Sequence, residues 1–273
     1  MSDRVTLVPK AGVREQFEVE GLTGDRLATL SEQAIARLPV WQGRVRAQLG
    51  DLFEVRGGGS ATVHIAGSVA HVHGIGAEMA GGAIVIDGDA GDRAGMTMSG
   101  GRIEVSGSVG ADAAVGMGGG SLHVRGGAGD RLGGARPGAP RGMTGGEIVV
   151  HGQAGSDVGA VCRRGLIVVG GDAGPDAGRA MIAGSVVVLG HTAPGAGRFN
   201  KRGSLVAVGG VDVPATYRYA CTYRPPHLRV TFRHLWQRYG LQVEPPIMDG
   251  RYRRYCGDLL DPGKGEILIW DGA

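Results

Sequence analysis

The chain has 273 residues, of which 54 are glycine, about three times the share found in average proteins. Its 29 basic and 26 acidic side chains nearly cancel to a net charge of +3, which does not indicate nucleic-acid binding. Three cysteines far apart in the sequence argue against a disulfide framework or a zinc ribbon, and no apolar run is long enough to span a bilayer. We therefore expect a cytoplasmic protein that binds neither nucleic acid nor membranes.

Residues 1–50 lack the regularity that follows them and are predicted to form an N-terminal cap. Thr29 and Glu32 have the spacing of a capping box for a short helix that runs to about Leu38, where Pro39 ends it. An open end of a repeat stack exposes unpaired backbone groups. We therefore expect this segment to cover the first repeat.

Residues 51–210 repeat with a period of 19 residues. Each repeat contains a short apolar strand that ends on a glycine, and five of the seven intervals between these glycines are 19 residues, the others being 21 and 26. The longest interval contains a loop-like insertion within Gly133–Gly142. The anchoring glycines are Gly67, Gly88, Gly107, Gly126, Gly152, Gly171, Gly190 and Gly209.

A strand with glycine-rich corners and no room for a helix indicates one coil of a parallel β-helix. Apolar residues four and two positions before each anchoring glycine share one strand face. Ile148, Ile167 and Val186 should therefore lie directly above one another in the core. A left-handed β-helix of the hexapeptide type would need a period divisible by six. We predict an all-β, right-handed parallel β-helix of about eight coils of 19 residues.

Two further columns recur in the coils. One holds glycines such as Gly165 and Gly184, which we expect at corners with positive φ. The other is predicted to be a buried core ladder rather than a soft metal site, because methionine fills irregular gaps. In it, Cys162 is expected to be a buried small side chain and not a nucleophile. The ladder contains Met79, Met98, Met117, Met143, Cys162 and Met181.

Residues 211–273 are rich in aromatic side chains and are predicted to form a C-terminal extension. Pro226 has the position of the first residue of an amphipathic helix that should end before Gly240. This extension is expected to pack on the flank of the coils or on a partner.

Two surface features are candidate partner interfaces. Valines follow one another at the outward-facing strand position of the later coils, and four stacked valines would form an apolar ribbon. Either the C-terminal extension or another protein of an assembly should cover it. Basic residues at equivalent corners two coils apart form a rim for an acidic partner or an anionic ligand, unless solvent alone covers them. The candidate residues are Val149, Val168, Val187 and Val206 in the ribbon, and Arg163, Arg164, Lys201 and Arg202 in the rim.

No catalytic, cofactor-binding or metal-binding residues are predicted. His71 and His73 lie two positions apart, but no third ligand has suitable spacing. His64 and His123 share the outward strand position, with two coils between them. The many closely spaced glycines follow the 19-residue period, so they are not nucleotide-binding fingerprints.

Three features together resemble a known family. They are the glycine spacing of the coils, the run Arg37-Leu38-Pro39-Val40-Trp41-Gln42-Gly43, and Gly257-Asp258-Leu259 followed by Gly263-Lys264-Gly265-Glu266-Ile267. Over nearly its whole length the chain resembles the C subunit of formylmethanofuran dehydrogenase, a glycine-rich β-helix that also occurs as the last domain of the glutamate synthase large subunit. Within this group it looks like the C subunit of the formyltransferase/hydrolase complex of methylotrophic bacteria.

The resemblance implies a non-catalytic scaffold subunit in one-carbon metabolism and formaldehyde oxidation. The complex would transfer a formyl group from formyl-tetrahydromethanopterin to a methanofuran-type carrier and hydrolyse the product to formate. Zinc and both carriers would belong to partner subunits: one like a zinc amidohydrolase, one that is the formyltransferase, and one like the B subunit of the family. The family gives the C subunit no catalytic residues.

Two other functions stay open. One is the C subunit of a molybdenum or tungsten formylmethanofuran dehydrogenase. The other is a free-standing carbohydrate-active β-helix enzyme, which would need paired carboxylates on one flank. Asp112, Asp157 and Asp176 share one repeat position, but Arg93 and Arg131 occupy it too. A solvated corner of mixed charge is therefore the favoured interpretation.

Overall fold

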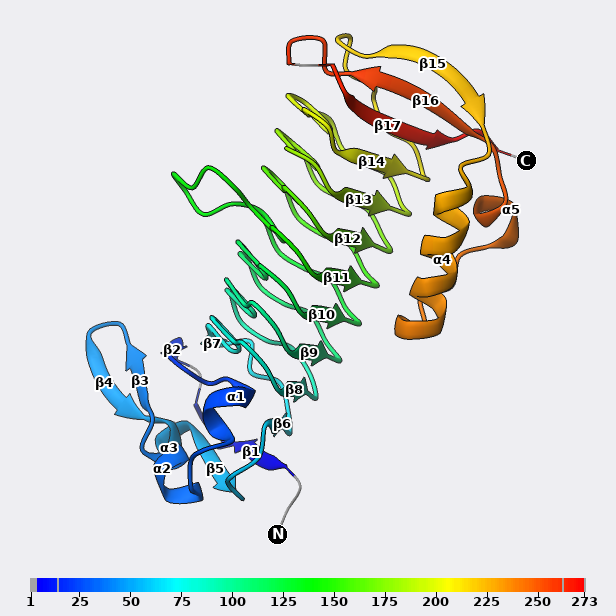
Figure 1. The fold of residues 1–273 in the computed structure, drawn as a ribbon. Helices are drawn as coiled ribbons and strands as arrows, with labels where there is room; N and C mark the ends of the chain where they lie inside the picture. Colours follow the sequence, from blue (N-terminus) through cyan, green and yellow to red (C-terminus); the bar gives the residue numbers. More distant parts are fainter. Residues whose placement is uncertain (1–3, 14, 262, 273) are drawn as a thin grey trace.

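The computed structural model describes residues 4–13, 15–261 and 263–272. Within these residues the chain is mostly β and forms a 13-stranded sheet and a smaller 4-stranded sheet, which agrees with the predicted all-β class. Figure 1 shows the chain winding through successive stacked coils between an N-terminal and a C-terminal segment. No helix among the described residues is long and apolar enough to cross a membrane.

Eight strands of the described chain stack in parallel, one from each coil. Their register pairs Ile148 with Ile167 and Ile167 with Val186, so the predicted vertical alignment is confirmed. A second line of parallel bridges joins the coils further along, from Val69–Ala90 to Thr192–Val211. The strands are β6 (Thr62–Ile65), β8 (Ala83–Ile86), β9 (Arg102–Val105), β10 (Ser121–Val124), β11 (Glu147–Val150), β12 (Leu166–Val169), β13 (Ser185–Val188) and β14 (Ser204–Ala207).

The glycines of the repeat serve two different purposes. Gly165 and Gly184 have φ values of +106° and +90°, so the predicted positive φ at this corner is confirmed. A Cβ at Gly152 would lie 2.8 Å from the carbonyl oxygen of Gly126 on the preceding coil. The anchoring glycine there is needed because the two backbones approach closely, and not because of its φ.

The interior of the coils is a continuous apolar core. The residues four and two positions before the anchoring glycines are fully buried, as at Ile148 and Val150. All members of the predicted methionine ladder, including Cys162, are 0 % exposed, so the prediction of a core ladder is confirmed. The next coil continues this column with buried Asn200, whose side chain makes two hydrogen bonds to the backbone of Gly203.

The N-terminal segment extends the large sheet and builds the small one. Strand β1 pairs in parallel with β6 and antiparallel with β5, which lies just beyond residue 50. The small sheet has the order β4-β3-β2-β7. The elements are β1 (Val5–Pro9), β2 (Phe17–Val19), α1 (Gly24–Leu27), α2 (Glu32–Ala36), β3 (Pro39–Gln42), β4 (Val45–Gln48), α3 (Leu49–Leu52), β5 (Phe53–Arg56) and β7 (Val72–His73).

The predicted capping box at Thr29 is wrong. Helix α2 begins after Ser31, whose hydroxyl accepts a hydrogen bond from the Ala34 amide. Thr29 instead donates its hydroxyl to the carbonyl oxygen of Arg26. Ser31, which directly precedes α2, therefore caps this helix. The Thr29 hydroxyl is bonded to the end of the preceding helix α1 instead.

The C-terminal extension adds three strands and a long helix. Strand β17 pairs in parallel with β14, and β16 and β15 follow as antiparallel neighbours. The predicted helix is present from Pro226 to Tyr239 and ends at Gly240, which has φ +68°. The elements are β15 (Arg218–Tyr223), α4 (Pro226–Tyr239), α5 (Pro245–Met248), β16 (Tyr252–Gly257) and β17 (Gly265–Trp270).

Candidate interaction surfaces

The four outward-facing valines are covered by the chain itself. Each of them is at most 1 % exposed, and together they pack with Leu228, Phe232 and Leu235 of α4 and with Leu268 of β17. Figure 1 shows α4 lying beside the coil strands. The expectation that Val149, Val168, Val187 and Val206 form a partner interface is therefore corrected: of the two coverings that the sequence left open, the structure shows the C-terminal extension.

The basic rim remains on the surface. Its members occupy equivalent corners, since the Arg163 and Lys201 amides each donate to the carbonyl oxygen of the ladder methionine one coil before. A shallow hollow of about 670 Å³ opens beside them, lined by Arg141, Arg163, Arg164 and Arg202 over Ile182 and Ala183. We call these four arginines together with Lys201 the arginine ridge.

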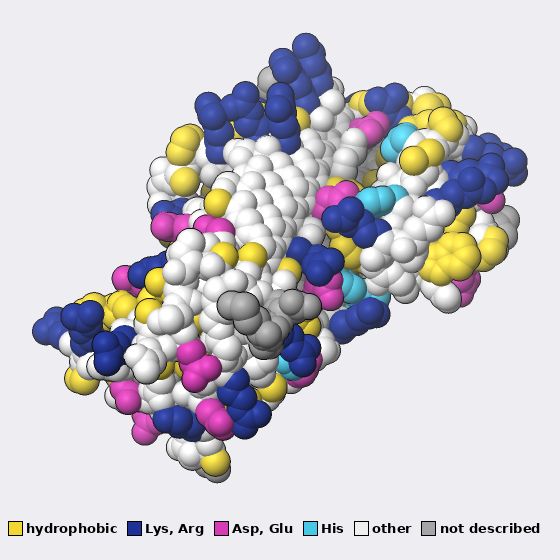
Figure 2. Space-filling view, turned by 60° about the horizontal axis from the view of Figure 1, so that its bottom comes forward, with side chains coloured by type: hydrophobic (Ala, Val, Ile, Leu, Met, Phe, Trp, Pro, Cys, Tyr) yellow, Lys and Arg dark blue, Asp and Glu magenta, His cyan; other side chains and the backbone are white. Residues whose placement is uncertain are grey.

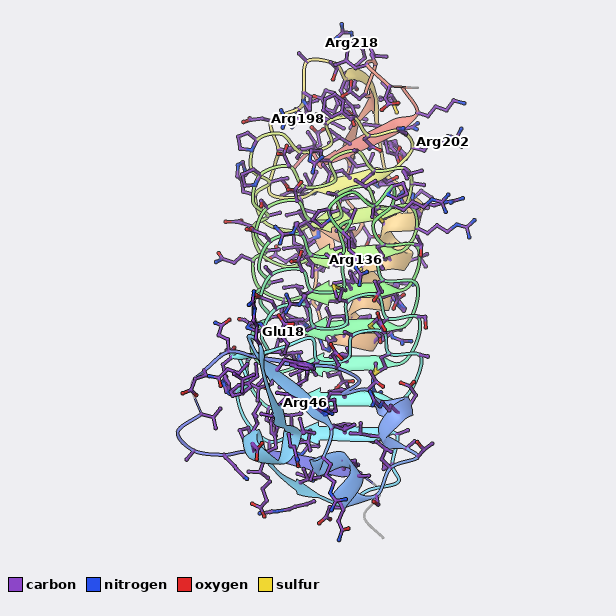
Figure 3. All side chains as sticks on the ribbon, turned by 90° about the vertical axis from the view of Figure 1, so that its left-hand side faces the viewer. Glu18, Arg46, Arg136, Arg198, Arg202 and Arg218 are labelled. Atoms are coloured by element: carbon purple, nitrogen blue, oxygen red, sulfur yellow. The ribbon has the colours of Figure 1, made fainter. Side chains whose placement is uncertain are left out.

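The ridge is rich in unpaired positive charge. Arg141, Arg164, Lys201 and Arg202 are exposed, and among the described residues no carboxylate forms an ion pair with any ridge member. Figure 2 shows basic side chains gathered along one edge of the stack. In Figure 3, Arg202 lies at the edge of the coils opposite Arg198. The ridge can therefore attract an anionic surface or ligand.

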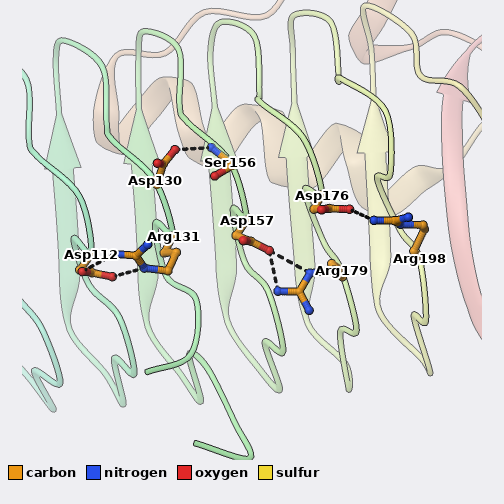
Figure 4. A network of polar contacts seen from close by, with 8 residues as sticks. All are labelled: Asp112, Asp130, Arg131, Ser156, Asp157, Asp176, Arg179 and Arg198. Carbon is orange, nitrogen blue, oxygen red and sulfur yellow. Dashed lines mark hydrogen bonds and ion pairs between the residues drawn. The ribbon is translucent and has the colours of Figure 1, made fainter. Parts of the chain in front are cut away.

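The corner aspartates are engaged with arginines. Asp112 binds Arg131 at 2.6 Å, Asp157 binds Arg179 at 2.7 Å and Asp176 binds Arg198 at 2.6 Å (Figure 4). Each of these carboxylates has an arginine as its direct partner, as a mixed-charge corner would have. The structure therefore supports the mixed-charge corner for Asp112, Asp157 and Asp176.

Other aspartates join one coil to the next. The Oδ1 atom of Asp130 accepts a hydrogen bond from the Ser156 amide at 2.7 Å, and Asp172 accepts one from the His191 amide in the same way. The bonds from Ser156 hold the pKa of the Asp130 carboxyl below its usual range. These carboxylates satisfy backbone amides at the corners, where no ladder of strand hydrogen bonds does so.

A histidine pair that sequence reasoning missed lies under the end of α4. The Nε2 atoms of His123 and His151 are 2.9 Å apart, and the Tyr239 ring lies against His123 with its centroid 5.2 Å away. Burial, together with repulsion from His151 and Arg125, lowers the pKa of His123 to about 4. Burial also lowers the pKa of His151. Both rings are therefore neutral near pH 7, with one Nε2 donating to the other.

A carboxylate beside this pair fastens α4 to the coils. Glu147 of β11 accepts hydrogen bonds from the Tyr239 hydroxyl and from His234 Nε2, the latter at 2.9 Å. Burial and the Glu147 carboxylate raise the pKa of Tyr239 to about 12. Glu147, His234 and Tyr239 therefore hold α4 against the coils through contacts within the chain.

The remaining candidates have structural partners. His73 is 7 % exposed, and its Nδ1 accepts a hydrogen bond from the Asp92 amide at 2.8 Å. His64 lies 2.7 Å from an Asp87 carboxylate oxygen. Burial raises the pKa of the Cys162 thiol to about 11, so this thiol is a poor nucleophile at neutral pH. Within the described chain no group of three or more His, Cys, Asp or Glu residues could hold a metal ion.

The fold and its surfaces define a glycine-repeat β protein whose polar groups mainly join coils and fasten α4. Among solved structures, a chain of the formyltransferase/hydrolase complex from Methylorubrum extorquens, determined with methylofuran, matches with a TM-score of 0.86 and 34 % identity, over 97 % of this chain and 98 % of that one. A scan against models of protein families finds no match.

A second relative is the C subunit of the molybdenum-containing formylmethanofuran dehydrogenase 1 of Methanosarcina barkeri. It is 35 % identical over 92 residues, which are 32 % of this chain and 31 % of that protein. The match therefore spans about a third of the relative's length. Together the two similarities show that the chain belongs to the family of formylmethanofuran dehydrogenase C subunits and is related to the formyltransferase/hydrolase complex.

Proposed function

We propose that this chain is a non-catalytic scaffold subunit of a complex that moves a formyl group from formyl-tetrahydromethanopterin to a methanofuran-type carrier and hydrolyses the product to formate. The similarity to a chain of a formyltransferase/hydrolase complex, over nearly the whole of both chains, carries the proposal. The corner aspartates support it, because each of them is engaged with an arginine of the same chain.

The proposal assigns the chemistry to partner subunits. A subunit like a zinc amidohydrolase would release formate from the formylated carrier by hydrolysis, and the formyltransferase subunit would bind tetrahydromethanopterin. A protein like the family's B subunit would complete the assembly in the cytoplasm. The present chain would supply a rigid body: an N-terminal cap over residues 1–50, a right-handed parallel β-helix over 51–210 and an extension over 211–273. Eight parallel strands in register support this architecture.

We assign the arginine ridge as the surface that docks an acidic region of a neighbouring subunit. Its support is the concentration of exposed guanidinium groups around one hollow, with no ion-pair partner among the described residues. Charge complementarity of this kind mainly raises association rates and selects the partner. The valine ribbon has no part in the assignment, because α4 covers it.

Co-expression with the partner subunits tests the scaffold role. The chain should co-purify with them, and leaving it out should abolish stable assembly and lower formate release from the formylated carrier. Full assembly and full activity without the chain would overturn the proposal. For the ridge, Arg164→Glu with Arg202→Glu should weaken co-purification at least about tenfold. The matched variant Arg46→Glu, on the exposed strand β4, should not.

A molybdenum or tungsten formylmethanofuran dehydrogenase is the second candidate complex, favoured by the 35 % identity to the Methanosarcina protein. The scaffold role of the chain would be the same in both. Metal and iron–sulfur analysis of the purified complex separates them. Zinc without molybdenum or tungsten supports the hydrolytic complex, and stoichiometric molybdenum or tungsten supports the redox enzyme.

A further inference from the structure

A cleft lies where the N-terminal segment meets the first coils, far along the chain from the arginine ridge. It encloses about 630 Å³, a volume in the range of small-molecule sites. Its walls come from β2 and the loop after it, from α1, from the corner after β7 and from the next coil. Glu18, at this junction in Figure 3, is one of its lining residues.

Negative charge dominates the walls of this cleft. Four carboxylates line it: Glu18, Glu20, Asp25 and Glu78. Glu18 binds Arg93 at 2.7 Å, whereas the other three form no ion pair within the described chain. With Arg26 and Arg93 as the cationic lining residues, the cleft has an excess of two negative charges.

The remaining polar groups do not cancel that excess. The Nη1 atom of Arg26 reaches the backbone carbonyl of Glu20 at 3.5 Å, passing where a side chain on Gly21 would be. Both ring nitrogens of His73 are engaged within the chain, because Nδ1 accepts the Asp92 amide hydrogen and Nε2 lies 2.6 Å from Gln16 Oε1. The cleft is therefore suited to a cation.

A largely buried threonine of the cleft has a hydroxyl without a partner. Thr23 is 5 % exposed and lines the cleft, so the little surface it shows lies there. It precedes α1, yet its side chain makes no capping hydrogen bond, and no other partner for it exists in the described chain. Because this hydroxyl oxygen is not among the fully buried side-chain atoms without a partner, a ligand in the cleft can reach it.

We propose that this cleft binds a primary ammonium group on an aliphatic chain. The unpaired carboxylates and the Thr23 hydroxyl would accept hydrogen bonds from the ammonium, and the apolar lining of Val19, Ala77 and Met96 would contact the methylene groups. The carboxylates are too dispersed for a metal ion, since the described residues hold no cluster of three that could bind one. A free polyamine and a lysine side chain of a partner both present this chemistry.

Isothermal titration of the full chain with two probes tests the site. The probes are spermidine and an end-blocked Gly-Lys-Gly peptide, both at low salt. The double variant Glu20→Gln with Glu78→Gln should weaken binding about tenfold or more, and Thr23→Val about threefold. The matched control Asp212→Asn, which removes an exposed carboxylate elsewhere in the chain, should leave both affinities unchanged.

The outcomes separate the two sources of the ligand. Tighter binding of spermidine supports a free polyamine, and tighter binding of the peptide supports a partner's lysine. Thermal melts must show that the variants are as stable as the parent. We expect this result because each substitution is either at an exposed position or close to isosteric. The proposal fails if neither probe binds with a dissociation constant below about 10 mM, or if the double variant binds both probes as the parent does.

Discussion

The inside and the outside of the coil strands are built by different rules. Inside, each coil repeats the contacts of its neighbour, as Ile148, Ile167 and Val186 do. Outside, the later coils are covered by α4 through contacts that occur once, such as those of Glu147 with Tyr239 and His234. A repeated core fails at any coil that breaks the register, whereas a unique contact can fail while the coils stay intact.

The largest expected effect comes from breaking the repeat itself. Gly165→Val forces a valine to φ +106° and places its Cβ 2.8 Å from the Gly146 carbonyl oxygen. Strain and the clash together should lower the free energy of unfolding by about 4 kcal/mol. Chemical denaturation measures this loss. Gly138→Val, at φ +78° with nothing within 4 Å, is the matched control and should cost no more than the strain alone, about 1–2 kcal/mol. Equal losses would show that the coil contact is unimportant.

A polar residue on the covered outer face should release α4 and leave the coils folded. Val187 is 1 % exposed beneath α4. Val187→Gln loses apolar burial and buries an amide, at a cost of about 3 kcal/mol. Hydrogen exchange should show α4 deprotected while β11–β13 remain protected. Val85→Gln makes the same change at the equivalent, half-buried position of β8, outside the apolar cluster that α4 covers, and should cost less than about 1 kcal/mol. Similar losses for both would contradict the special role of the covered face.

These two faces also differ in how far the sequence predicts them. The period identified the inner stack, the buried methionine column and the positive φ of Gly165, because every coil repeats the same geometry. Pro226 and Gly240 gave the bounds of α4 through their backbone preferences. Where α4 docks was not predictable. That position depends on single contacts between residues distant in sequence, such as Glu147 with Tyr239.

The contact between His123 and His151 was not predicted for the same reason: the repeat does not relate the two positions. His123 holds the outward strand position, but His151 lies one residue before its anchoring glycine, so the period does not place them together. Their proximity comes from the pairing of β10 with β11, which sets His123 opposite Val149, two residues before His151, and Tyr239 packs against His123. The row of outward valines did show that something must cover them, although the sequence could not say which segment does.

Acidification should weaken the covered face before it affects the inner stack. The folded pKa of His123 is about 4, below the ordinary value of about 6.5, so the unfolded chain binds protons first as the pH falls. The stability that the neutral pair contributes is therefore complete above about pH 6.5 and is lost between there and pH 4. Hydrogen exchange of α4 across this range should show faster opening at low pH.

A histidine variant separates this effect from general acid denaturation. His123→Gln removes the group whose pKa is lowered to about 4 and should flatten the pH dependence of α4 opening between pH 6.5 and 4. His227→Gln, on an exposed histidine at the start of α4, is the control and should retain it. An unchanged pH profile in His123→Gln would show that the pair does not govern the docking of α4.

The smallest effect should come from the charged corners, which repeat like the core but face water. Asp157 and Arg179 have side chains 27 % and 36 % exposed, and pairs of this kind contribute at most about 1 kcal/mol. Asp157 also has φ +58°, which asparagine tolerates well. Asp157→Asn should therefore lower the free energy of unfolding by only about 0.5 kcal/mol. Asp157→Val, which removes the pair and adds strain for a β-branched residue at that φ, should cost about 1–3 kcal/mol. If both substitutions cost the same, the ion pair and not the backbone conformation determines which residues the corner accepts.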